Sequence, residues 1–160
     1  MARPNPIRKI MATELPSRKL QRTKPFRPTE EDIIYTYNII NRYIFDGQLR
    51  RPKITQGRIK KCWGLCRWHD DSRTGKFHTD IKLVDKWYCI QWFMNTLAHE
   101  MIHQWQWEVY REENGGIYEY SGAHGPSFFL WRDRFAEYGL HLKTSHRMKK
   151  WFKYQDFNKC

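Results

Sequence analysis

Apolar side chains recur at helical spacing over three stretches of the chain, and these stretches predict three helices. The first follows Thr29, a residue suited to capping a helix, and ends at Asp46-Gly47. The second spans about residues 87–110, and the third covers residues 126–138. The core-facing positions of the second stretch are Ile90, Met94, Leu97, Met101 and Trp105.

Between the first two predicted helices, the pattern changes to short apolar runs separated by turn residues. The runs cover residues 54–59, 61–68 and 76–84, and a polar loop over residues 70–75 separates the last two. They predict a small antiparallel sheet. The fold class is therefore α+β, with this sheet packed against the second predicted helix and two or three further helices.

Charge divides the chain into a neutral body and two basic ends. The net charge is +12, but residues 1–28 hold eight Lys/Arg against one Glu, and residues 141–160 hold six against one Asp. The stretch between them has fifteen charges of each sign. We therefore predict a basic extended arm over residues 1–28, a folded domain over residues 29–140 and a basic C-terminal segment over residues 141–160. Thr144 or Ser145 can cap a terminal helix in that segment.

Segregated positive charge favours a polyanionic partner, most often nucleic acid, although two solubilising tails would give the same composition. The predicted sheet adds a basic patch at its entrance, which is the best candidate on the body for contacting phosphate, and part of which can be a solvated strand edge. The patch consists of Arg50, Arg51, Lys53, Arg58, Lys60 and Lys61.

The second predicted helix carries His99-Glu100-Met101-Ile102-His103, a His-Glu-x-x-His pattern. Residues four apart lie on one helix face, so both imidazoles can reach one metal ion, and the adjacent carboxylate can accept a proton from water. His99 and His103 lie roughly 200° and 240° around the helix from Leu97, away from the core stripe. The spacing therefore favours a metal site over a surface coincidence.

A third ligand must come from elsewhere in the chain. His124 is the best candidate, because it stands in a Gly-rich turn directly before the helix that begins at Pro126. Glu119 and Glu137 are alternatives. A metzincin would have Gly at position 106 and His at 109, where this sequence has Gln106 and Val109, so that class is excluded.

His99-Glu100-x-x-His103, followed by His124-Gly125-x-x-Phe128, resembles the metallopeptidase domain of the SprT-like family, which includes the Spartan proteases. The segments 45–49 (Phe-Asp-Gly-Gln-Leu) and 81–83 (Ile-Lys-Leu) extend the resemblance over roughly residues 30–140. Many members carry a four-cysteine zinc ribbon after the catalytic domain, and this sequence has no such cysteine pairs there. A role of that ribbon on DNA is thus unsupported.

The resemblance implies a zincin-like fold with one zinc ion per chain, held by His99, His103 and His124, and with Glu100 as the general base. It implies a zinc metalloendopeptidase that acts on proteins, often at or near DNA. Tyr118 or Tyr120 can add a hydrogen bond to the oxyanion or simply pack.

Two other functions fit the sequence less well than a peptidase. One is a non-catalytic protein, binding nucleic acid or forming part of an assembly, in which zinc only stabilises the fold. Glu100 argues against it, because a structural site needs no carboxylate beside the metal. The other is a magnesium-dependent nuclease, which fits less well because no carboxylate-rich site is evident.

The four cysteines form no regular disulfide framework, and the sequence shows neither a signal peptide nor a membrane span. These features predict an intracellular protein, in the cytoplasm or nucleus, that is not secreted and contacts no membrane. A second metal site from Cys62, Cys66, His69 and His78 is disfavoured, since two residues four apart on one strand stand about 13 Å apart.

Overall fold

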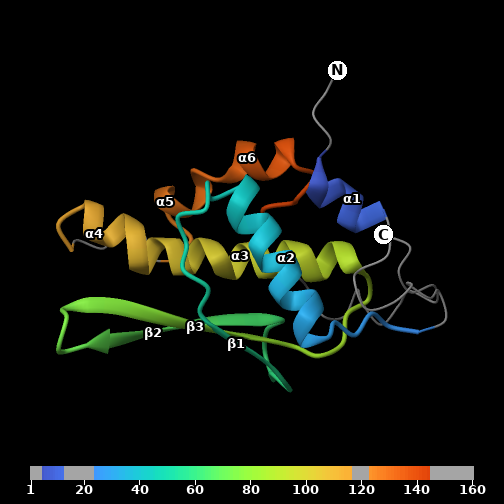
Figure 1. The fold of residues 1–160 in the computed structure, drawn as a ribbon, viewed down its shortest axis with the longest axis horizontal. Coiled ribbons are helices and arrows are strands. Elements are labelled where there is room, and N and C mark those ends of the chain that lie inside the picture. Colours follow the sequence, from blue (N-terminus) through green and yellow to red (C-terminus); the bar gives the residue numbers. More distant parts are fainter. Residues whose placement is uncertain (1–4, 13–23, 117–122, 145–160) are drawn as a thin grey trace.

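The computed structural model describes residues 5–12, 24–116 and 123–144. It confirms an α+β fold in which a three-stranded sheet lies on one side of a long central helix, α3 (Ile90–Trp105) (Figure 1). Helix α2 (Glu30–Tyr43) crosses α3, and helices α1 (Pro6–Ala12), α5 (Pro126–Phe129) and α6 (Arg132–Glu137) lie on the side of α3 away from the sheet (Figure 1).

Helix α2 begins after the predicted cap and ends at Tyr43, three residues before the predicted stop at Asp46-Gly47. The Thr29 hydroxyl accepts a hydrogen bond from the Asp32 amide at 3.2 Å, and the Asp32 carboxylate accepts one from the Thr29 amide at 2.9 Å, which completes a capping box. Beyond the helix, Asp46 and Gly47 adopt positive φ angles of 55° and 73°, so the chain turns away from the helical path there.

The sheet is mixed, so the prediction of an antiparallel sheet is wrong for one of its strands. Its strands lie in the order β1-β3-β2, and their bounds are Lys53–Gln56 for β1, Gly64–Asp71 for β2 and Lys76–Leu83 for β3. Strands β2 and β3 form the expected antiparallel hairpin, with Gly64 opposite Leu83. Strand β1 pairs in parallel with the other side of β3, with Lys53 opposite Asp80. This order leaves β2 as the edge strand that faces α3.

The predicted second helix is continuous but changes its geometry. After Trp105, α3 passes into a π-helix, η1 (Gln106–Tyr110), in which the Arg111 amide donates to the Gln106 carbonyl five residues earlier. A short helix, α4 (Arg111–Glu113), follows. The residues predicted to face the core from α3 are all buried: Ile90, Met94, Leu97, Met101 and Trp105.

The N-terminal segment departs from its prediction. An extended arm is wrong for Pro6–Ala12, which form helix α1 and bury Ile7 and Ile10 in the common core. Further along, Phe26 is also buried, forms an antiparallel bridge with Trp87 and packs its ring 5.4 Å from that of Phe93. These parts of residues 1–28 therefore belong to the folded body.

The predicted third helix is broken in two. Its parts are α5 (Pro126–Phe129) and α6 (Arg132–Glu137), and the buried Phe128 and Phe135 join each part to the core. The predicted terminal helix lies outside the described residues, and the division into three regions stays a prediction. In the described part of the chain, every helix is too short or too polar to cross a membrane.

Candidate metal centre

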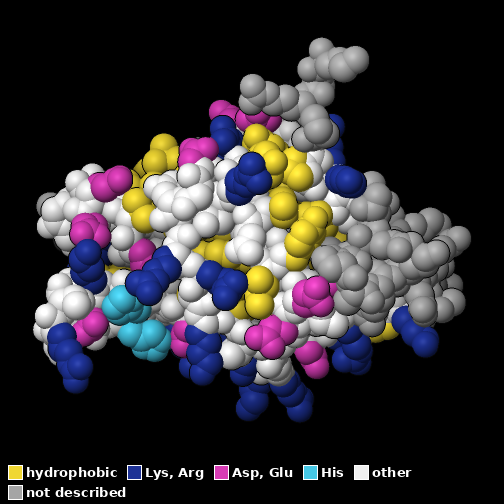
Figure 2. Space-filling model, viewed as in Figure 1, with side chains coloured by type: hydrophobic (Ala, Val, Ile, Leu, Met, Phe, Trp, Pro, Cys, Tyr) yellow, Lys and Arg dark blue, Asp and Glu magenta, His cyan; other side chains and the backbone are white. Residues whose placement is uncertain are grey.

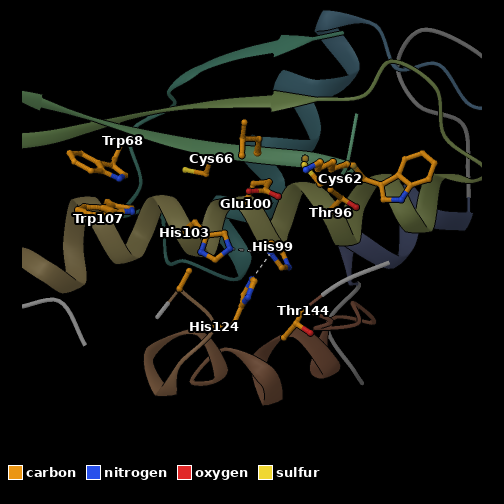
Figure 3. Close-up of a pocket in the computed structure, with 15 residues that line it drawn as sticks. Cys62, Cys66, Trp68, Thr96, His99, Glu100, His103, Trp107, His124 and Thr144 are labelled. Carbon is orange, nitrogen blue, oxygen red and sulfur yellow. Dashed lines mark hydrogen bonds between the residues drawn. The ribbon is translucent and has the colours of Figure 1, made fainter. Parts of the chain in front are cut away.

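Helix α3 and the turn before α5 bring three histidines together (Figure 3). Nε2 of His103 lies 3.1 Å from Nε2 of His99, and Nε2 of His124 lies 3.2 Å from the same atom. The two helical histidines are half-buried, whereas His124 is exposed. The three imidazoles thus converge on one point at the surface of α3.

Hydrogen bonds on the far side of two rings fix which nitrogens face that point. Nδ1 of His99 lies 2.8 Å from the Lys143 carbonyl oxygen, and Nδ1 of His103 lies 2.7 Å from Oε1 of Gln106. Both oxygens can only accept, so both Nδ1 atoms donate, and in the neutral rings the Nε2 atoms carry lone pairs. Two lone pairs face each other at 3.1 Å, an arrangement that a shared cation would stabilise.

Two of the spacings between the ligand nitrogens, at 3.1 and 3.2 Å, fit a small tetrahedral ion, and all three nitrogens lie within 4.8 Å of one another. With metal–nitrogen bonds of about 2.0–2.1 Å, as zinc makes, ligand nitrogens stand about 3.3 Å apart. Burial lowers the pKa of His103 to about 4, although the hydrogen bond that His103 donates to Gln106 opposes the fall, and burial also lowers the pKa of His124. Both rings are therefore neutral at neutral pH, which is the form that binds a metal.

Gln106 connects the helical ligand with the turn that carries His124. Its side chain is fully buried, and its Oε1 accepts from His103 while its Nε2 donates to the Ala123 carbonyl at 2.9 Å and to Oγ of Ser127 at 2.8 Å. Because Ala123 directly precedes His124, this one amide orients two of the three rings.

Phe128 forms an apolar floor under the histidines. Its ring is fully buried, and its centroid lies 4.9 Å from that of His99, 5.4 Å from that of His103 and 4.7 Å from that of His124. A floor of this kind restricts the rotation of all three imidazoles and excludes water from one side.

Glu100 lies beside the histidines, in the interface between α3 and β2. It is only 5% exposed, and the backbone of Cys66 on β2 donates a hydrogen bond to its carboxylate. Burial raises the pKa of Glu100 to about 8, although the bond from Cys66 opposes the rise. The close approach of β2 depends on Gly64, since a Cβ there would stand 2.8 Å from Oε1 of Glu100.

The histidines and Glu100 open into one cavity of about 480 Å³. One end is formed by Trp68 of β2 and Trp107 of η1, whose rings stack 4.6 Å apart (Figure 3). Cys62, Thr96 and Thr144 lie at the other end (Figure 3), and Lys61 and Trp63 also line the cavity.

The structure brings together the three predicted ligands and Glu100, but not the alternatives. Glu137 is exposed on α6, outside the three-histidine group, while Glu119, Tyr118 and Tyr120 lie outside the described residues. Among the described residues, no second metal-ligating group is found. Instead, His69 pairs with Asp80 at 3.2 Å and His78 with Asp71 at 3.5 Å, and Cys62 and Cys66 are free cysteines.

Several residues of the site are missing from the sequence-based prediction, and some of them had a signal. Trp107 continues the four-residue spacing of His99 and His103, and Gly64, Cys66 and Trp68 alternate on one face of a strand. Gln106 and Phe128 had no such signal for these roles, because their partners come from other elements.

The fold and the site together define an α+β protein with a candidate metal centre, in which a helix and a following turn supply three convergent histidines. A sequence comparison makes the class more specific. The chain belongs to the SprT-like family, whose profile matches residues 35–146, the larger part of the chain. No curated protein matches the chain as a relative.

Proposed function

We propose that the chain is a zinc-dependent endopeptidase of the SprT-like type, with His99, His103 and His124 as ligands and Glu100 as the general base. One observation carries the proposal. Two Nε2 lone pairs face each other at 3.1 Å while both Nδ1 atoms are held by acceptors, and a buried carboxylate stands on the next residue of the helix. A shared cation beside a carboxylate is what hydrolysis of a peptide bond requires.

A zinc ion held by the three imidazoles supplies a Lewis acid that polarises water and a peptide carbonyl, and its charge favours the ionised form of a nearby carboxyl. The backbone of Cys66 holds the Glu100 carboxylate towards the cavity. Glu100 accepts a proton from the water that attacks the carbonyl carbon and delivers it to the leaving amine nitrogen.

The cavity favours a catalytic zinc site over a zinc site that only stabilises the fold. A structural zinc site fills its fourth position with a protein ligand, whereas a catalytic site leaves it open to water and substrate. The described residues supply three ligands to this site, His99, His103 and His124, and the three line a cavity of about 480 Å³ that Glu100 also lines. A length of polypeptide can enter such a space.

The proposal extends to proteins at or near DNA as the substrates, and so to a site of action inside the cell, in the cytoplasm or nucleus. Lys and Arg side chains gather along the edge of the molecule that the sheet occupies, with acidic groups between them (Figure 2). The six patch residues named from the sequence are all exposed, and none forms an ion pair with a described carboxylate. This patch supplies phosphate contacts, and the basic ends add to it.

The test is Glu100→Gln, assayed with casein and for self-cleavage, with and without single-stranded DNA. Gln keeps the size of the side chain but cannot take a proton, so we expect zinc to stay bound while the rate falls by roughly 10² to 10⁴. Metal content is measured on the same samples. The matched control is Glu113→Gln, because Glu113 is an exposed glutamate on α4 away from the cavity, and it should cleave at the wild-type rate.

A Glu100→Gln protein that cleaves as fast as the wild type would contradict the mechanism. Zinc binding with no cleavage by either form, on any substrate or with DNA, would favour the non-catalytic binding protein instead.

A further inference from the structure

An exposed aromatic wall closes one end of the cavity that holds the histidines. It consists of Trp68, which is 50% exposed, and Trp107, whose ring stacks on it with an interplanar angle of 22°. Trp68 is one of three large apolar side chains that stand out as exposed among the described residues. An exposed Trp ring inside a cleft is a surface ready to bind an apolar group.

The wall is braced from the side away from the cavity. The Phe77 ring lies 5.6 Å from that of Trp68 and 5.1 Å from that of Trp107. The Arg111 guanidinium lies over Phe77 at 4.3 Å and over Trp107 at 5.0 Å. These contacts hold both indoles in place before a ligand arrives, so little conformational entropy is lost when one binds.

The wall and the metal centre share one helix face. Trp107 follows His103 by four residues, as His103 follows His99, and all three side chains line the same cavity. On the opposite side of the cavity, strand β2 carries Trp68 two residues after Cys66, whose backbone holds Glu100. The wall lies on the His103 side of the three histidines (Figure 3), so a polypeptide that crosses the histidines can place a neighbouring side chain against it.

We propose that Trp68 and Trp107 form a specificity subsite, which binds a bulky apolar side chain, above all an aromatic one, close to the peptide bond that is cleaved. This inference rests on the proposed function and names the class of substrate, an unfolded or extended polypeptide with an exposed aromatic residue. Aromatic rings pack well on such a wall, since offset stacking adds to the burial of apolar surface.

The lining favours a peptide side chain over a nucleic-acid base. A stacked base needs a cation for its phosphate within one nucleotide's length. Among the described residues that line the cavity, Lys61 is the one Lys or Arg, and it directly precedes Cys62, which lies at the end away from the wall (Figure 3). Arg111 braces the wall from outside the cavity lining, and strand β2, which carries Trp68, contributes the uncharged Leu65 and Cys66 to that lining.

The first experiment measures a ratio of cleavage rates. Fluorogenic peptides that differ only in Phe or Gly are scanned over the three positions on each side of the cleaved bond. At one position the wild type should show a kcat/KM at least about tenfold higher for Phe. Trp68→Ala and Trp107→Ala should bring that ratio close to one, and Trp68→Phe should keep most of it. Tyr35→Ala is the matched control, because Tyr35 is a 43% exposed aromatic on α2, outside the cavity, and should leave the ratio unchanged.

The second experiment measures binding without cleavage. The zinc-loaded Glu100→Gln protein is titrated into labelled Phe and Gly peptides, and fluorescence anisotropy reports affinity. The Phe peptide should bind about tenfold more tightly, and adding Trp68→Ala should abolish the difference. If the wild type cleaves no peptide but this difference is found, the peptidase proposal fails and the subsite stands.

Two results would overturn the subsite. One is efficient cleavage by the wild type with a Phe/Gly ratio of kcat/KM that Trp68→Ala and Trp107→Ala leave unchanged. That result would support the peptidase and reject the subsite. The other is a loss of affinity for a labelled single-stranded oligonucleotide in Trp68→Ala with unchanged peptide binding, which would assign the wall to bases.

Discussion

At the scale of single residues, the site depends on how closely the backbone of β2 approaches the base. Gly64 is buried, and a Cβ added there would stand 2.8 Å from Oε1 and 2.9 Å from Cγ of Glu100, and 2.9 Å from Cγ2 of Thr96. Contacts that short must be relieved by movement. Because α3 is fixed by its core stripe, the Glu100 side chain is the group that moves.

Gly64→Ala should therefore separate metal binding from catalysis. We expect zinc to be retained and kcat to fall at least about tenfold, because a displacement of the base of the order of 1 Å is costly. Metal content and cleavage rate are measured together. Gly57→Ala is the control, since its Cβ would meet the flexible Lys82 side chain at 3.4 Å, and it should keep full activity. Equal rates in all three proteins would show that Glu100 tolerates the shift.

His124→Ala tests the third ligand. Two histidines on one helix cannot complete a tetrahedral site, so the dissociation constant for zinc should rise by more than about 100-fold, and activity should fall with it. Titration against a competing chelator measures the affinity. His141→Ala, the loss of an exposed histidine outside the cavity, should leave it unchanged. Stoichiometric zinc with wild-type affinity in His124→Ala would move the third ligand to Glu119.

The sequence predicted the residues whose roles depend on local spacing. His99, Glu100 and His103 follow from a helix period, and His124 follows from a turn before a proline. Gln106 and Phe128 could not be predicted, because their roles depend on atoms of α3 and the His124 turn that come together only in the folded chain. Gly64 is an intermediate case, since strand alternation gives its face but not the 2.8 Å approach to Glu100.

At the scale of elements, the change from α3 to the π-helix η1 coincides with the site. Such turns are rare and occur often at functional sites. The first residue of η1 is Gln106, whose buried amide bonds both His103 and the turn before His124. The next is Trp107 of the aromatic wall.

Gln106→Leu should loosen the metal centre. Leu has a similar volume but neither accepts from His103 nor donates to Ala123, so the zinc affinity should fall about 10- to 100-fold. Gln104→Leu is the matched control, because that buried glutamine bonds Tyr37 and the Arg50 carbonyl, away from the metal. Both variants should lose thermal stability, but Gln104→Leu should keep its zinc affinity. If Gln106→Leu and Gln104→Leu lowered the zinc affinity equally, Gln106 would contribute to stability alone and not to the orientation of the ligands.

Helix ends could be predicted better than strand pairing, for a physical reason. The capping box at Thr29 and Asp32 is a local arrangement that a few residues determine. Whether a strand pairs in parallel depends on the path of the chain between strands. Strand β1 pairs with the side of β3 opposite to β2, and the residue pattern within β1 does not indicate this partner or its direction.

At the scale of the whole molecule, the N-terminal helix is part of the core. Ile7 is fully buried and Ile10 is 5% exposed, and α1 packs beside α2 and the end of α6. Part of the basic stretch 1–28, with Arg8 and Lys9, is therefore a structural element. Removing this region to test DNA binding would also remove core packing, so charge substitutions are the cleaner experiment.

Ile7→Ala should lower the free energy of unfolding by about 2–5 kcal/mol, the usual loss when a fully buried aliphatic side chain is truncated. Chemical denaturation of the metal-loaded protein measures it. Arg8→Ala, at the exposed neighbouring position, should change stability by less than about 0.5 kcal/mol. A change that small in Ile7→Ala would show that α1 is dispensable for the fold.

The contact between the two ends of the body has a consequence for synthesis. Asn5 donates from its side chain to the Glu137 carbonyl at 3.5 Å, across 132 residues of sequence. During synthesis α1 emerges before α2 and long before α6, so its contact with the end of α6 can form only when almost the whole described body has been made. Until then α2 alone can cover part of Ile7 and Ile10. Helix α1 is therefore among the last elements of the body to be fully packed, although it is made before the helices that cover it.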